Sequence, residues 1–177
     1  GRVVWFTGLS GSGKTTLARA LQARLEARGQ RVTHIDGDEA RAFTQAAVGY
    51  TAQDRERHLR YLTFTAKKAA EHSDLVLVTA LSPFDQLRQW ARTCLSRYVE
   101  VYVQCPLEVC IQRDPKGHYA RALQGGLDNF VGVDQDYEVP TTPDCVVETG
   151  KWAVEVCVDQ VMTALSRVSP PRLAAAL

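Results

Sequence analysis

The feature that most constrains this chain is a glycine-rich loop at residues 8–15, with the sequence Gly-Leu-Ser-Gly-Ser-Gly-Lys-Thr. Its spacing matches the pattern G-x-x-x-x-G-K-S/T of phosphate-binding loops. The preceding residues, 2–7, are mostly β-branched and aromatic, which is typical of a buried strand. Residues 15–28 place leucines and alanines at helical spacing and end before Gly29. A strand, a glycine-rich turn and a helix in this order predict an α/β fold whose loop binds phosphate groups.

Each part of this loop has a physical role in holding a nucleoside triphosphate. Glycines let backbone N–H groups turn inward around phosphate oxygens, and the following helix adds the positive end of its dipole. Lys14 is expected to reach the β- and γ-phosphates, and the Thr15 hydroxyl to ligate Mg²⁺. We therefore predict binding of a nucleoside triphosphate with Mg²⁺ on Gly8, Leu9, Ser10, Gly11, Ser12, Gly13, Lys14, Thr15 and Thr16.

Strands and helices alternate along the rest of the chain. The patterns predict strands at 31–36, 74–79, 99–105 and 144–149, and helices at 38–47, 52–71, 84–96, 107–113 and 152–166. This alternation predicts one α/β domain over residues 1–168, a P-loop NTPase-type three-layer αβα sandwich with a parallel sheet. Residues 114–143 are rich in glycine and proline and form a long irregular segment, which is usually functional or disordered. Residues 169–177 are predicted to be a tail or linker.

Composition argues against several classes of function. The 177 residues include 21 Lys+Arg and 20 Asp+Glu, and this near-neutral balance argues against a nucleic-acid binder. No apolar run approaches the ~20 residues of a membrane helix, and no basic-then-apolar leader is present, so we expect no membrane partner. Five cysteines without C-x-x-C spacing predict buried thiols and a reducing, cytoplasmic location. Sixteen of the 21 cations are arginines, which fits a coding bias or, for a few of them, phosphate or sulfate recognition.

Two carboxylates follow the second predicted strand, in the sequence Asp36-Gly37-Asp38. Ligands of open α/β sheets bind at this end of the strands. The carboxylates can orient Mg²⁺ through water and accept a proton from an attacking hydroxyl, or either one can cap the following helix. The sequence contains no guanine-specific N-K-x-D motif, which favours a small-molecule kinase over a GTPase.

Several blocks of the sequence resemble the adenylylsulfate (APS) kinase family. They are residues 5–18, 36–38, 81–83, 105–110 and, most distinctively, 113–119 together with 129–138. The resemblance covers about residues 3–165. It implies that ATP phosphorylates the 3′-hydroxyl of APS to give PAPS, the donor of activated sulfate. It also implies a mobile lid at about 114–138, a homodimer and, in some members, fusion to ATP sulfurylase.

The resemblance further implies roles for charged residues. Asp38 matches the carboxylate that contacts Mg²⁺ or the acceptor hydroxyl, and Asp36 precedes it in the same motif. Lys116 matches a lid lysine that approaches the phosphates when the lid closes and excludes water. Arg41 and Arg55 match arginines that hold the phosphosulfate. These residues are our candidates for catalysis and acceptor binding.

Aromatic and small residues complete the implied acceptor site. Phe130 matches the lid aromatic that stacks on the APS adenine, and Tyr50 lies where the family has a phenylalanine on the opposite face. Leu81 and Ser82 match a pair that lines the acceptor. Ser82 also matches a phosphoserine position of parts of the family, but in-line transfer needs no covalent intermediate, and a helix N-cap before Pro83 explains this serine equally well.

The sequence departs from the family pattern in its acceptor half. Glu39 and His58 stand where the family has asparagines, Asp85 where it often has arginine, and residues 120–123 lack the usual lysines of the lid. His58 can pair with the charge of an acceptor or lie solvated on its helix. Two alternatives therefore stay open: a P-loop kinase with a different hydroxyl acceptor, and a non-catalytic nucleotide-binding regulatory domain.

Overall fold

A computed structural model describes residues 1–44 and 49–167 of the chain. Its centre is one sheet of five parallel strands in the order β2-β3-β1-β4-β5. The strands are β1 (Arg2–Thr7), β2 (Val32–Asp36), β3 (Leu75–Thr79), β4 (Tyr98–Gln104) and β5 (Cys145–Glu148). Because β1 is central, the loop that follows it opens at the middle of the carboxyl edge of the sheet.

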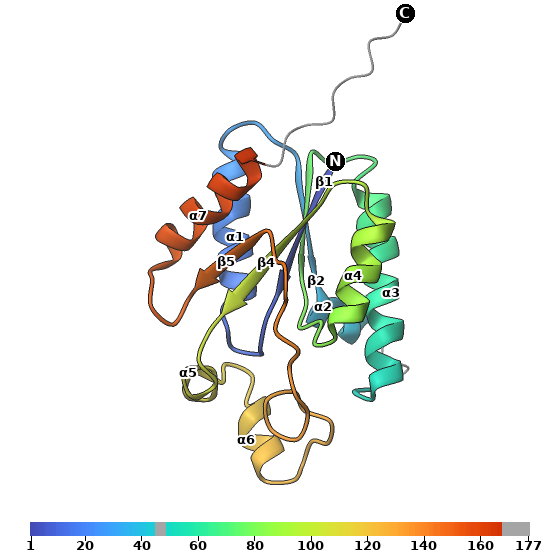
Figure 1. Cartoon of the computed structure of the whole chain (residues 1–177), viewed down its shortest axis with the longest axis vertical. Helices are drawn as coiled ribbons and strands as arrows, with labels where there is room; N and C mark the ends of the chain where they lie inside the picture. Colours follow the sequence, from blue (N-terminus) through green and yellow to red (C-terminus); the bar gives the residue numbers. More distant parts are fainter. Residues whose placement is uncertain (45–48, 168–177) are drawn as a thin grey trace, which may run out of the picture.

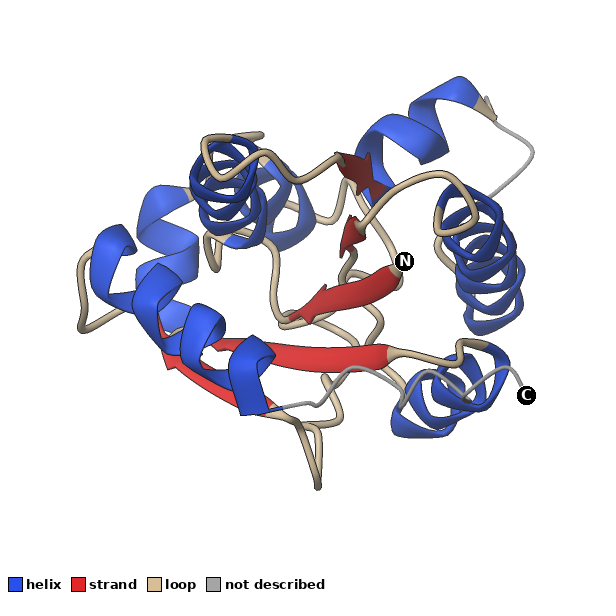
Figure 2. Ribbon diagram, turned by 90° about the horizontal axis from the view of Figure 1, so that it is seen from above, coloured by secondary structure: helices blue, strands red, loops and turns tan. Residues whose placement is uncertain are grey.

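Helices cover both faces of the sheet and give the predicted three-layer sandwich. Helices α1 and α7 lie on one side, and α3 and α4 lie on the other (Figure 1; Figure 2 shows the layers from above). The short helices α5 and α6 lie beyond the carboxyl ends of the strands (Figure 1). The bounds are α1 (Lys14–Glu26), α2 (Gly37–Phe43), α3 (Ala52–Ala69), α4 (Asp85–Cys94), α5 (Leu107–Arg113), α6 (His118–Leu123) and α7 (Val154–Arg167).

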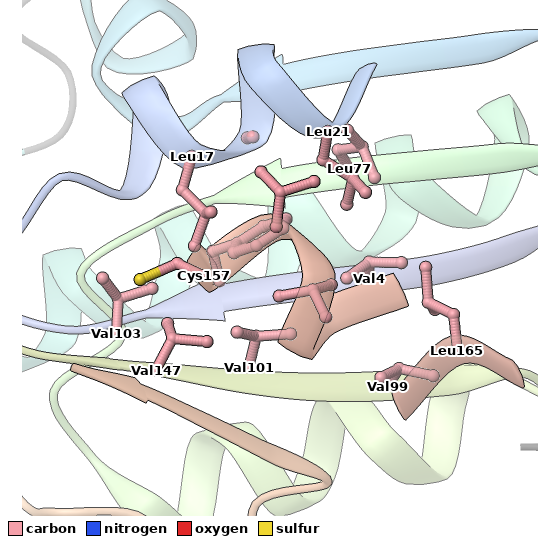
Figure 3. Close-up of a cluster of buried hydrophobic side chains, with 14 of the residues drawn as sticks. Val4, Leu17, Leu21, Leu77, Val99, Val101, Val103, Val147, Cys157 and Leu165 are labelled. Carbon is pink, nitrogen blue, oxygen red and sulfur yellow. The ribbon is translucent and has the colours of Figure 1, made fainter. Parts of the chain in front are cut away.

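The two faces of the sheet bury two apolar clusters. On one face, Leu17 and Leu21 of α1 and Cys157 and Leu165 of α7 belong to one buried cluster over the strands (Figure 3). On the other face, side chains of α3 and α4 pack on Trp5 of β1. A third, smaller cluster lies under the segment predicted to be a lid, and contains Cys105, Cys110, Tyr119, Ala122 and Phe130. Burial on both faces explains why strands such as β3 are continuously apolar.

The structure corrects two expectations about the elements and the cysteines. Helix α6 lies within residues 114–143, where no element was expected; it follows Gly117, whose φ is +65°, and the Asp114 carboxylate accepts hydrogen bonds from the amides of Tyr119 and Ala120. The thiols of Cys94 and Cys145 are only partly buried, so the expectation of five buried cysteines was wrong for these two.

The other predicted elements agree with the structure to within a few residues. The helix expected at 38–47 ends at Phe43, and its last predicted residues lie outside the described part of the chain. The expected tail at 169–177 also lies outside it. Over the described ranges, no helix is long and apolar enough to cross a membrane.

Candidate active site

The phosphate loop, residues 8–15, has a backbone that requires glycine. Gly8, Gly11 and Gly13 have φ angles of +148°, +73° and +93°, a region that L side chains rarely adopt. A Cβ atom on Gly8 would lie 2.5 Å from the Val103 carbonyl oxygen, and one on Gly11 would lie 2.8 Å from that of Cys110. The loop is therefore held tightly between β1, β4 and α5, and no side chain can replace these glycines without a shift of the backbone.

Lys14 folds back over the loop that carries it. Its Nζ donates hydrogen bonds to the carbonyl oxygens of Gly8 (2.8 Å) and Leu9 (2.7 Å). Burial is the main cause that lowers the pKa of Lys14 to about 8, although the carboxylate of Asp38 raises it. An ammonium with so little solvent around it gains from an anionic partner such as a phosphate oxygen.

Asp36 connects the phosphate loop with β3 and α2. One of its carboxylate oxygens accepts hydrogen bonds from the hydroxyls of Thr15 (2.8 Å) and Thr79 (3.2 Å), and the other accepts from the amides of Asp38 (2.9 Å) and Glu39 (3.4 Å). Burial opposes the charged form, but these hydrogen bonds outweigh it and lower the pKa of Asp36. Asp36 therefore caps α2 and also orients the hydroxyl of Thr15; the capping role predicted for one of the two carboxylates is confirmed for Asp36.

Asp38 and Lys116 form an ion pair across the site. Asp38 lies in the first turn of α2, and Lys116 lies in the loop between α5 and α6. Both side chains are exposed, so solvent screens their attraction and either can exchange partners. The structure thus brings together the predicted acceptor carboxylate and the predicted lid lysine.

The larger of two cavities, about 650 Å³, opens over the phosphate loop. Lys14, Thr15, Asp36, Asp38 and Lys116 line it at the loop, and Glu39 lines it too rather than the acceptor side. Its remaining wall includes residues to which sequence reasoning gave no role, namely Arg113, Thr149 and Trp152.

Arg113 and Thr149 join two segments around this larger cavity. The Arg113 guanidinium donates to the Thr149 carbonyl oxygen (2.8 Å), and the Thr149 hydroxyl donates to the carbonyl of Ser12 (2.6 Å). Arg113 stands in the distinctive block at 113–119, which was the one available sequence signal. Thr149 and Trp152 gave no signal because only the fold brings the end of β5 to the loop.

A second cavity of about 70 Å³ holds the predicted acceptor residues together. Asp38 borders both cavities, so a group in the larger one and a group in the smaller one meet at this carboxylate. The smaller cavity is lined by Arg41, Tyr50, Arg55, His58, Leu81, Ser82 and Phe130, together with residues of their neighbourhood.

Cationic side chains surround one aromatic ring in the smaller cavity. The guanidinium carbons of Arg41 and Arg55 lie 5.0 Å and 5.5 Å from the centroid of the Tyr50 ring. Arg55 also donates to the carbonyls of Tyr50 (3.1 Å) and Asn129 (2.6 Å). Burial and then the charge of Arg41 lower the pKa of Arg55 to about 10, so both arginines stay charged at neutral pH and favour an anionic ligand.

A comparison with known proteins identifies the family. The model of the family "Adenylylsulphate kinase" matches residues 1–148. The chain belongs to the adenylylsulfate kinase family. An adenylyl-sulfate kinase of Chloroflexus aurantiacus is 43% identical over 168 residues, which are 95% of this chain and 90% of that protein.

Two further relatives extend this family assignment. A probable bifunctional SAT/APS kinase of Sorangium cellulosum is 39% identical, and the match covers all of this chain but 31% of that longer protein. The solved structure of the Mycobacterium tuberculosis APS kinase in complex with AMPPNP and APS has a TM-score of 0.89 and 36% identity. The match covers 94% of this chain and 98% of the Mycobacterium tuberculosis chain.

His58 differs from the solvated histidine that helix surfaces usually carry. It is 8% exposed, and burial together with the charge of Arg41 lowers its pKa to about 4. Its Nδ1 has no hydrogen-bond partner among the described residues. The expectation that His58 lies solvated on its helix was therefore wrong. Its neutral imidazole is part of the wall of the smaller cavity, the predicted acceptor cavity.

Ser82 is held in place rather than exposed for reaction. Its Oγ accepts a hydrogen bond from the indole of Trp5 (3.0 Å), and the side chain is buried. The N-cap of α4 is Phe84, so the expectation that Ser82 caps this helix was wrong. Asp85, which stands in place of a family arginine, is paired with Arg88 and lines neither cavity. Arg88 therefore offsets the negative charge of Asp85, which borders neither cavity.

Phe130 and Tyr50 lie on the same cavity, as the adenine sandwich requires. Phe130 is 4% exposed and packs edge-on against Tyr119, with ring centroids 5.0 Å apart. The cavity between them is far smaller than the several hundred Å³ that a nucleotide occupies. In this conformation the cavity is therefore too small to hold a nucleotide.

Proposed function

We propose that this chain transfers the γ-phosphoryl group of ATP to the 3′-hydroxyl of adenylyl sulfate, and so forms PAPS and ADP. One observation carries the proposal: Asp38 stands on the border of a phosphate-binding cavity and a second cavity with two arginines and two aromatic rings. Membership of the adenylylsulfate kinase family supports the same reaction.

The donor half of the mechanism depends on the phosphate loop. Lys14 exchanges its two carbonyl partners for phosphate oxygens, and the inward amides of the loop bind further oxygens. The hydroxyl of Thr15 and the carboxylates of Asp36 and Asp38 face the same cavity and are the hard oxygen ligands that suit Mg²⁺. When bound, Mg²⁺ neutralises charge on the phosphates.

The transfer step is an in-line displacement. The acceptor oxygen forms a bond to the γ-phosphorus while the bond to the β,γ-bridging oxygen breaks, and ADP leaves with that electron pair. Asp38 accepts the proton of the attacking hydroxyl. Lys116 leaves Asp38 for the phosphates as this carboxylate engages the hydroxyl, which the exposed ion pair permits. No covalent intermediate on Ser82 is needed, and its hydrogen bond to Trp5 favours a structural role.

The acceptor half recognises a nucleotide with an anionic tail. Arg41 and Arg55 hold the phosphosulfate, and Phe130 and Tyr50 stack on the two faces of the adenine. Leu81, Ser82 and the neutral His58 complete the wall. The segment 114–138 acts as the lid, because its residues Lys116 and Phe130 reach into the two cavities.

We further propose that the chain acts as a cytoplasmic homodimer and, in a longer protein, next to an ATP sulfurylase unit. The bifunctional Sorangium relative, of which this chain matches 31%, supports the second part. The dimer is carried over from the family resemblance; mass measurement in solution at micromolar concentration tests it, and a monomeric mass contradicts it.

An APS-dependent assay tests the proposed reaction. Purified protein with ATP, Mg²⁺ and APS is expected to yield PAPS and ADP in equal amounts. Lys14→Ala is expected to lower kcat by about 10²–10³, since it removes a charged donor to the transferred group. Lys67→Ala, which changes an exposed lysine of α3, is the matched control.

Three outcomes of this assay contradict the proposal in different ways. Turnover with another adenylate but not with APS would indicate a different acceptor. Nucleotide binding without turnover at saturating substrates would indicate a regulatory domain. Full activity of Lys14→Ala would exclude the assigned role of the phosphate loop.

Phe130→Ala tests the adenine sandwich. Stacking of a base on an aromatic ring contributes roughly 1–3 kcal/mol, so the KM for APS is expected to rise about 5- to 150-fold. The KM for ATP should change less than twofold. Phe64→Ala, at a phenylalanine that is 61% exposed on α3, is the control and should leave both KM values unchanged. Equal changes in both KM values for Phe130→Ala would contradict the assigned position of the ring.

A further inference from the structure

Arg88 of α4 is a fully buried cation that lines neither cavity. None of its side chain is exposed to solvent. A buried guanidinium is costly unless each of its N–H groups finds a partner, so its contacts show what it holds. Sequence reasoning gave Arg88 no role.

Its two terminal nitrogens bind carbonyl oxygens from two distant segments. Nη1 donates to the carbonyl of Ser82 (2.7 Å), and Nη2 donates to that of Glu138 (2.7 Å). Nη2 also binds the carboxylate of Asp85 (2.8 Å). Ser82 belongs to the wall of the acceptor cavity, and Glu138 is the last residue of the predicted lid. A planar guanidinium has the rigid geometry for such a bridge, whereas an ammonium is a single point of charge.

Other hydrogen bonds join the same two segments around Arg88. The Glu138 amide donates to the carbonyl of Pro83 (2.9 Å), and the Glu138 carboxylate accepts from the amide of Asp85 (2.6 Å). The Arg88 guanidinium carbon also lies 5.6 Å from the centroid of the Tyr137 ring. The carboxyl end of the lid is therefore fastened to the acceptor wall around Arg88. The Thr7 hydroxyl, which binds the Tyr137 hydroxyl (2.8 Å) and the carbonyl of Leu81 (2.8 Å), joins the same two segments.

The wall that Arg88 holds has an unfavourable backbone conformation. Ser82 has a φ of +45°, in the left-handed region that costs a non-glycine residue free energy and persists only where neighbours enforce it. Buried donors hold this residue: the guanidinium of Arg88 (2.7 Å) and the hydroxyl of Thr7 (3.4 Å) at its carbonyl, and the indole of Trp5 at its hydroxyl. Leu81 and Ser82 line the same cavity as Arg41 and Arg55.

We infer that Arg88 is a positioning residue for the acceptor: it fixes the Leu81–Ser82 wall and anchors the end of the lid that carries Phe130. Arg88 touches no substrate, so it acts through these two segments. The effect on APS rests on the proposed function, whereas the effect on the two segments does not.

The competing explanation is that Arg88 only neutralises a buried carboxylate. Glu100 of β4 is fully buried, and its Oε1 lies 3.0 Å from Nε of Arg88 as an ion pair. Arg92, one turn further along α4, supplies the comparison. It pairs with the same Glu100 (3.3 Å) and with Asp144 (2.8 Å), but it contacts neither Ser82 nor Glu138.

The experiment therefore compares changes at Arg88 with a change at Arg92. Arg88→Lys keeps the charge but loses the two-carbonyl bridge. The double variant Arg88→Met with Glu100→Gln removes both buried charges, so Glu100 is not left as a buried carboxylate without Arg88, although the partly exposed Asp85 loses its partner. Arg92→Met is the control. We expect both Arg88 variants to raise the KM for APS at least tenfold, with the KM for ATP within twofold. Arg92→Met should lower the melting temperature and leave both KM values within twofold.

Hydrogen exchange gives a second readout that needs no activity. In the Arg88 variants, amides of residues 82–85 and 137–139 should exchange at least tenfold faster than in the unsubstituted chain. In Arg92→Met they should not. Each protein is measured at the same number of degrees below its own melting temperature. If the unsubstituted chain forms no PAPS, the proposed function fails, and this comparison still decides the inference.

Several results would overturn the inference. They are KM shifts of equal size for ATP and APS, the same pattern in Arg92→Met as in Arg88→Lys, and unchanged exchange at both segments. Failure of both Arg88 variants to fold, while Arg92→Met folds, would likewise assign Arg88 a purely structural role.

Discussion

The acceptor cavity contains a neutral imidazole next to two guanidinium groups. His58 lies beside Arg41 and Arg55, whose charges disfavour its protonation; the nearby carboxylate of Asp38 and a hydrogen bond to the Gly37 backbone act in the opposite sense. Burial dominates and lowers the pKa of His58 to about 4. The imidazole therefore stays neutral where the family pattern has a neutral asparagine amide, which preserves the charge of the site.

This lowered pKa predicts how stability depends on pH. Between pH 6.5 and 4 the unfolded chain binds a proton at His58 that the folded chain does not. The contribution of neutral His58 to the free energy of unfolding is therefore complete above pH 6.5 and is lost as the pH falls toward 4. A pKa shift of this size changes the free energy of unfolding by at most about 3 kcal/mol. His58→Asn is expected to flatten this part of the stability profile, measured as the free energy of unfolding in urea. His72→Asn, at an exposed histidine, should leave the profile parallel to that of the unsubstituted chain. A profile of His58→Asn that keeps its slope would contradict the buried neutral state.

At the scale of elements, the start of α2 determines how the proposed magnesium ligands are arranged. Asp36 ends β2, caps α2 through the amides of Asp38 and Glu39, and accepts a hydrogen bond from the hydroxyl of Thr15. A single carboxylate therefore links the strand, the helix and the phosphate loop. Loss of this side chain disturbs both stability and nucleotide binding.

Two substitutions at Asp36 separate these effects. Asp36→Ala removes the cap, which typically contributes about 0.5–2 kcal/mol, and leaves the Thr15 hydroxyl without this partner. We expect the free energy of unfolding to fall by that amount and the KM for Mg-ATP to rise. Asp36→Asn keeps an acceptor for the helix amides, so it should recover most of the stability but not the KM. Equal stability of the two variants, measured by urea unfolding, would show that the cap contributes little.

Periodicity and motifs predicted the elements well because those signals are local. The phosphate loop and the carboxylates of Asp36 and Asp38 could be placed from sequence, since strand, turn and helix follow one another within a few residues. The burial of His58 and the contacts of Arg88 could not be predicted. A charged or polar residue on an amphipathic helix is usually solvated, and the partners that bury these two come from α2, β4 and the lid end. Helix α6 was missed for a related reason: its cap comes from Asp114, outside the usual spacing.

At the scale of the whole molecule, the site lies on the carboxyl edge of the sheet while the stability comes from the two faces. The cluster between the sheet and helices α1 and α7 is the larger of the two main ones. Leu21 is fully buried in it (Figure 3), whereas Leu123 of α6 is 62% exposed. A change in the cluster should therefore affect folding more than binding.

Leu21→Ala tests this separation. Truncation of a buried leucine costs about 2–5 kcal/mol, and we expect that loss in the free energy of unfolding with both KM values within twofold at 20 °C. Leu123→Ala, the same change at an exposed position, should cost less than about 0.5 kcal/mol. A large rise in either KM for folded Leu21→Ala would show that the core and the site are coupled more closely than their separation suggests.

The strand order also determines when the site can form during synthesis. The strand that leads into the phosphate loop is made first, yet its two neighbours in the sheet, β3 and β4, begin at Leu75 and Tyr98. Contacts of such long sequence separation form slowly, and a chain emerging from a ribosome cannot make them until the later strands have appeared. A nascent chain that ends before β4 therefore carries the loop without the sheet that shapes it, and nucleotide cannot assist its folding until β4 is in place.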